Sequence, residues 1–241
     1  MRLALQIVGL AVGLPLELLI IAALLRGGYR RLPFVFAYTI VDFLITVVEI
    51  FPAFDYLRGI QHPATSLTSL YWIDEVVEQV LIYAVVMSLI YGATRTLRSR
   101  RMVRLSVLLG AVLIAGVSFL AHYNPALNPG EWMTPWTRDL NFCSAILDLG
   151  LWALLIGSRK HDPQVLLLSG ALGIKFAGES IGESVRQLAI RNRSRSVSLT
   201  GSVIMMLADV FFLYVWWQAL RSPRTAPALV PNREASAPTT S

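Results

Sequence analysis

Hydrophobic positions along this chain form long runs, and polar positions gather in the short segments between them. A helix needs about 20 mostly apolar residues to cross the roughly 30 Å hydrocarbon core of a membrane. The pattern therefore predicts an all-α bundle of seven transmembrane helices. They are expected at residues 3–25, 33–54, 70–93, 103–123, 140–158, 165–190 and 199–220.

The first run is predicted to be a true span and not a cleaved signal peptide. It is too long for the apolar core of a signal peptide, contains Glu17, and ends without a small-x-small cleavage pattern.

Composition supports a membrane protein. The chain of 241 residues is 55% hydrophobic and 15% charged, whereas soluble domains carry about 25% charged residues. Residues 1–221 are expected to form one membrane domain. Residues 222–241 are rich in Pro, Ser, Thr and Ala and predict a disordered cytoplasmic tail.

Cys143 is the single cysteine, so no disulfide can form within the chain.

Basic residues predict the orientation, because short cytoplasmic loops are enriched in Lys and Arg. With the N-terminus outside, thirteen of the 21 Lys and Arg residues fall on the inner side and six on the outer side. The expected topology is therefore N-out and C-in. Anionic membrane lipid is a sufficient partner for the net charge of +6, and no nucleic-acid partner is needed.

Ten of the fifteen acidic residues lie inside the apolar runs. A charged side chain at the centre of a span costs roughly 2.5–3.5 kcal/mol on insertion scales, so these groups should face the bundle interior or water. The fourth run has no acidic residue and predicts a peripheral or lipid-facing helix. The candidate ligand- or proton-binding residues are Lys175, Glu179, Asp209, Asp42, Asp148, Glu78 and Glu183.

The sixth run shows how these charges converge. At about 100° per residue, Lys175, Glu179, Glu183 and Arg186 fall within one narrow arc of the helix. The i,i+4 spacing predicts pairing of Lys175 with Glu179, and the i,i+3 spacing predicts pairing of Glu183 with Arg186. Lys175 is the one cation expected at mid-depth, against several acids.

The excess of acids over bases favours an outward-facing polar cavity. Such a cavity would bind a small ligand or cation in a proton-coupled carrier or a sensor. Three alternatives remain open: polar groups that only fix helix packing, an intramembrane lipid-modifying enzyme with a Glu as general base, and a scaffold or assembly subunit. Gly178 and Gly182 form a GxxxG pair that could join helices, including those of a homo-oligomer.

Enzyme signatures are weak in the sequence. It contains no HExxH, P-loop or GxGxxG pattern. Residues 178–182, GESIG, match G-x-S-x-G in letters alone, because they lie inside an expected helix and not at the strand-to-helix turn that this motif needs. We therefore assign no catalytic residue, metal site or cofactor, and favour a protein that is not an enzyme. A retinal protein is disfavoured because rhodopsin families carry the retinal lysine in the last span, whereas the last run here holds Asp209 and no lysine.

Two segments in roughly the first 90 residues, RRLPFVFAYTIVDF and SLYWIDEVVEQVLIYAVV, carry a resemblance. They resemble a pattern of uncharacterised bacterial multi-span membrane proteins. The resemblance implies a multi-pass protein of the bacterial inner (plasma) membrane. It implies no activity and no functional residues.

Overall fold

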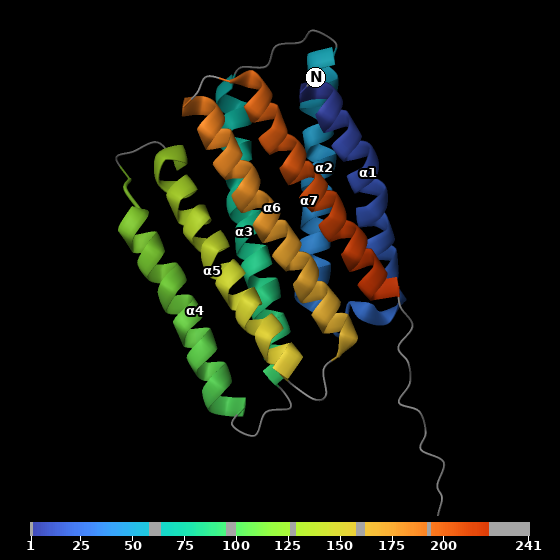
Figure 1. Ribbon diagram of the computed structural model, residues 1–241, viewed down its shortest axis with the longest axis vertical. Coiled ribbons are helices and arrows are strands. Elements are labelled where there is room, and N and C mark those ends of the chain that lie inside the picture. Colours follow the sequence, from blue (N-terminus) through green and yellow to red (C-terminus); the bar gives the residue numbers. More distant parts are fainter. Residues whose placement is uncertain are drawn as a thin grey trace, which may run out of the picture.

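The computed structural model describes residues 2–57, 64–94, 100–125, 129–157, 162–191 and 194–221, and its regular elements there are all helices (Figure 1). These residues form α1 (Arg2–Ala23), α2 (Pro33–Leu57), α3 (Ala64–Ala93), α4 (Arg100–His122), α5 (Pro129–Gly157), α6 (Pro163–Arg191) and α7 (Arg195–Arg221). The predicted all-α bundle is therefore confirmed. The predicted tail at 222–241 lies outside the described residues.

A π-helical turn, η1 (Leu24–Gly28), extends α1 and ends where the chain reverses towards α2. Gly27 has a φ of 123° in this turn, a backbone conformation that glycine adopts at little cost.

Six of the described helices are long and apolar enough to cross a membrane, namely α1 with η1, α3, α4, α5, α6 and α7. In α2 the apolar segment among the described residues is shorter, Pro33–Val48. Helix α5 begins at Pro129, earlier than the predicted start at residue 140. Hydropathy marks only the part of a helix that fits the hydrocarbon, whereas the helix itself continues into the interface.

The core of the bundle lies where α1, α2, α3, α5, α6 and α7 meet. Trp216 on α7 is fully buried, and its indole N–H donates a hydrogen bond to the Leu168 carbonyl of α6 at 3.1 Å. The Trp216 ring packs edge-on against Tyr38 of α2 and tilted against Phe212, with centroid distances of 5.6 and 4.5 Å. The ring contacts join α2 to α7, and the hydrogen bond joins α7 to α6, so three helices are held at one level.

Helix α4 is peripheral, as its lack of acidic residues predicts. It lies beside α5 at the edge of the bundle and packs mainly against that helix (Figure 1). Its apolar side chains Leu105, Val112, Val117 and Leu120 are exposed in the isolated chain. Such a surface suits contact with lipid.

Glycines bring α6 and α7 into close contact. A Cβ built at Gly178 would lie 2.0 Å from the Ala208 Cβ, and one at Gly182 would lie 2.9 Å from the Gly201 carbonyl oxygen. Only glycine allows backbones to approach so closely. The face with Gly178 and Gly182 is thus covered by α7 of the same chain, and a contact between copies through these glycines stays a prediction.

We expect Gly178→Ala to destabilise the protein, because the added methyl group would overlap with Ala208. Overpacking of this kind typically costs about 1–3 kcal/mol. Thermal unfolding in detergent should show a lower midpoint. Adding Ala208→Gly to Gly178→Ala should restore part of the loss.

Gly150→Ala is the matched control, since a Cβ at Gly150 meets no atom within 4 Å. Its midpoint should be unchanged or slightly raised, because Ala favours helix more than Gly does. Equal midpoints for Gly178→Ala and Gly150→Ala would contradict the close contact.

Candidate functional site

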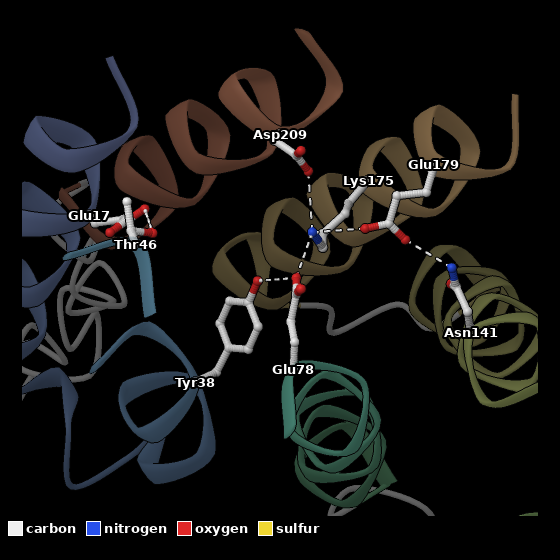
Figure 2. Close-up of polar contacts among 8 residues, drawn as sticks. All are labelled: Glu17, Tyr38, Thr46, Glu78, Asn141, Lys175, Glu179 and Asp209. Atoms are coloured by element: carbon white, nitrogen blue, oxygen red, sulfur yellow. Dashed lines mark hydrogen bonds and ion pairs between the residues drawn. The ribbon is translucent and has the colours of Figure 1, made fainter. Parts of the chain in front are cut away.

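Lys175 occupies the centre of a buried polar cluster. It lies near the middle of the span Pro163–Ala189 of α6, and its side chain is 7% exposed. Its Nζ atom is 2.8 Å from Glu179 Oε1, 3.0 Å from Glu78 Oε1 and 3.2 Å from Asp209 Oδ1 (Figure 2). These partners come from α6, α3 and α7. We call the four residues the Lys175 cluster.

Neighbouring polar groups hold the carboxylates of the Lys175 cluster in place. Asn141 of α5 donates a hydrogen bond from Nδ2 to Glu179 Oε2 at 2.8 Å. The Tyr38 hydroxyl of α2 donates to Glu78 Oε1 at 3.4 Å (Figure 2). Five helices therefore contribute side chains to one site. Such bonds fix the rotamers of the carboxylates and so the positions of their oxygens.

The Lys175 cluster has more acid than base. One ammonium group contacts three carboxylates, which gives an excess of two negative charges when all four groups are ionised. Asp42 on α2 adds to this excess, because it lies within electrostatic range of Glu78, Lys175 and Asp209. Uncompensated charge is unfavourable in a buried site. Uptake of protons or of a cation would relieve it.

Access to the Lys175 cluster is uneven. The side chain of Asp209 is 45% exposed and that of Glu78 is 29% exposed, whereas Glu179 is 16% exposed. The ammonium group of Lys175 is enclosed behind them. A positively charged ligand could therefore reach Asp209 or Glu78 first.

The structure brings four of the seven candidate residues into direct contact, namely Lys175, Glu179, Asp209 and Glu78. Asp42 is within electrostatic range of this group. The predicted pairing of Lys175 with Glu179 is confirmed.

Asp148 and Glu183 lie apart from the Lys175 cluster. Asp148 is buried and accepts a hydrogen bond from the Ser169 hydroxyl at 2.7 Å, between α5 and α6. Glu183 pairs with Arg186 at 3.5 Å on an exposed part of α6, as its spacing predicts. Glu183 shares the arc of Lys175 but lies two turns further along α6. A suitable depth for Asp148 does not fix the rotation of α5, which turns its carboxyl group towards Ser169. Their roles in binding stay predictions.

Two surface hollows of the described residues lie away from the Lys175 cluster. One is on α7, lined by Ser196, Leu199, Thr200, Val203 and Ile204, and another lies between α1 and α7. Both are mainly apolar, and neither is lined by a residue of the Lys175 cluster. The polar atoms of the Lys175 cluster contact one another, and the outward-facing cavity stays a prediction. In the part of the chain searched, no group of three or more His, Cys, Asp or Glu could hold a metal ion.

Tyr38 and Asn141 contact the Lys175 cluster but are not among the residues predicted from the sequence. An aromatic residue in an apolar run is usually a core or interface residue, so Tyr38 received no role. A signal was present, because Tyr38 lies four residues before Asp42 and thus on the same face of α2. Its hydroxyl reaches Glu78 across the helix contact.

We expect Lys175→Met to lower the stability of the protein strongly, because it leaves three carboxylates facing one another without a cation. Removing one partner of a buried ion pair typically costs about 3–5 kcal/mol. Thermal unfolding in detergent should show this loss. Acidification should reverse part of it, since protonation of the remaining acids removes their repulsion.

Glu183→Gln is the matched control, because the Glu183–Arg186 pair is exposed and such pairs contribute about 0–1 kcal/mol. Glu179→Gln combined with Lys175→Met should be more stable than Lys175→Met alone. A double variant that shows only the sum of the two losses would mean that the ion pairs are not coupled.

Comparisons with protein-family models, with curated proteins and with solved structures found no match. The resemblance to uncharacterised bacterial membrane proteins therefore stays a prediction. The chemistry of the Lys175 cluster is the basis on which its function has to be interpreted.

Proposed function

We propose that this multi-pass membrane protein binds a proton or a small cation at the Lys175 cluster, as a proton-coupled carrier or a sensor. The observation that carries the proposal is one buried ammonium group shared by three carboxylates from three helices. Intramembrane charges that only fix packing would be expected to balance one another. Here the acids exceed the base, and the excess selects for positive charge.

Competition for Lys175 provides the mechanism. A proton or cation that binds Asp209 or Glu78 replaces Lys175 as the partner of that carboxylate. The ammonium group keeps Glu179, which lies one turn away on the same helix. Because Glu78 belongs to α3, losing its contact releases α6 from that helix, whereas α6 and α7 stay joined through their glycine contact. The outward-facing cavity would open by this release.

The surroundings of the Lys175 cluster favour a cation over an anion. Phe212 presents its ring to Lys175, with Nζ 5.6 Å from the ring centroid. Aromatic faces attract cations, and a small organic cation that took the place of the ammonium would meet the same ring. An anion would be repelled by three carboxylates, and the one ammonium group is already paired with them.

We further propose seven spans with the N-terminus outside, in a bacterial inner membrane. Helix α2 connects α1 to α3, both of which are long and apolar enough to span. The Tyr38 ring lies within the bundle core, between side chains of α3 and α7. Basic residues favour the inner side for the α1–α2 connection.

Flux measurements test the function. Purified protein in liposomes with an internal pH indicator should move protons when a gradient of sodium, potassium or tetramethylammonium chloride is imposed. We expect Glu78→Gln and Asp209→Asn to reduce this flux at least tenfold, because each removes a carboxylate that binds the cation. Asp162→Asn, which removes a half-exposed ion pair with Arg31 away from the cluster, should leave it unchanged.

Binding without flux would identify a sensor. In that case the same cations should raise the thermal unfolding midpoint of the wild-type protein, by linkage, and not that of Asp209→Asn. The proposal would be overturned if none of the three salts produced either flux or cation-dependent stabilisation.

Cysteine labelling tests the topology. In a Cys143→Ser background, Arg30→Cys and Asn124→Cys place single thiols in the α1–α2 and α4–α5 connections. In spheroplasts, a membrane-impermeant maleimide should label position 124, and label position 30 only after lysis. Three helices separate the two positions, so labelling from the same side would mean that α2 does not span. Labelling of position 30 in spheroplasts, with labelling of position 124 only after lysis, would contradict the N-out orientation.

A further inference from the structure

A second buried acid, Glu17 on α1, lies outside the Lys175 cluster. Its residue is 4% exposed, although it sits within the span Ile7–Gly28. The Thr46 hydroxyl of α2 donates a hydrogen bond to Glu17 Oε1 at 3.3 Å, and Figure 2 shows this pair to one side of the Lys175 ammonium group. Glu17 Oε2 is buried and has no hydrogen-bond partner among the described residues.

An ionised carboxylate in this position would lack compensation. Lys175, the buried cation, contacts Glu78, Glu179 and Asp209. No Lys or Arg of the described part of the chain forms an ion pair with Glu17. A single, long hydrogen bond from a threonine cannot replace the hydration of a charged carboxylate. A neutral carboxylic acid avoids this cost and can still accept the Thr46 hydrogen bond.

We propose that Glu17 and Thr46 form a separate proton-binding site, in which Glu17 carries the proton. The proton resides on one carboxyl oxygen, and the other accepts the hydrogen bond from Thr46. Gly13, one turn before Glu17, presents no side chain to the carboxyl group; a Cβ built there would lie 3.7 Å from Oε1.

Asp42 links this site to the Lys175 cluster. It lies four residues before Thr46 and thus on the same face of α2. It is within electrostatic range of Glu17 on α1, Glu78 on α3, Lys175 on α6 and Asp209 on α7. Loss of the Glu17 proton would place a new negative charge near Asp42. Occupancy of the two sites is therefore coupled, but the Glu17 site does not require that the cluster binds a cation.

Infrared spectroscopy tests the site directly. Protonated carboxyl groups have a C=O stretch that is separate from the bands of carboxylates and amides. A difference spectrum of wild type against Glu17→Gln at neutral pH should show loss of one such band. Thr46→Val should keep the band but shift it to higher frequency, because the carbonyl loses its hydrogen bond. Glu183→Gln, an exposed acid with an Arg partner, should leave the band unchanged.

Loss of a carboxylate band in Glu17→Gln, with the protonated band intact, would show that Glu17 is ionised and would overturn the proposal. If Glu17→Gln does not fold, Thr46→Val decides the question, and absence of a frequency shift would equally overturn it. Neither measurement depends on flux, so the Glu17 site can fail while the proposed function stands, and the reverse.

Discussion

The sharing of Lys175 among three carboxylates constrains the whole bundle. The ammonium group meets Glu179 on its own helix, Glu78 on α3 and Asp209 on α7, so these helices have one depth and one rotation at which all the contacts form. Apolar packing alone tolerates small rotations, because lipid-facing and buried positions are both apolar in a membrane protein. A buried ion pair does not tolerate such rotations, since each lost contact leaves a charged group without compensation.

Much of this site could be predicted from the sequence. The 3.6-residue period of a helix predicts the contact of Lys175 with Glu179. The similar depth of Lys175 and Asp209 in the membrane predicts that these two residues lie close together. Rotation of each helix about its axis could not be derived, because a seven-helix pattern does not say which helices are neighbours. Asp148 shows the consequence: it has a suitable depth but faces Ser169.

The two buried acid sites differ in how their charge is handled. In the Lys175 cluster, carboxylates compete for a cation that the chain itself supplies. At Glu17, the chain supplies only a hydroxyl donor. Asp42 stands within electrostatic range of both. Charge at one site therefore alters the electrostatic field at the other, as is required where proton binding is linked to a second binding event.

The glycine contact between α6 and α7 has a consequence for motion. With Gly178 and Gly182 packed against the backbone of α7, these helices have little freedom to separate or slide, and they are expected to move as one rigid pair. The bond between Lys175 and Asp209 lies inside that pair, whereas the bond to Glu78 reaches across to α3. A rearrangement that moves α6 and α7 together relative to α3 would thus break the ion pair between Lys175 and Glu78 first, and keep the ion pair between Lys175 and Asp209.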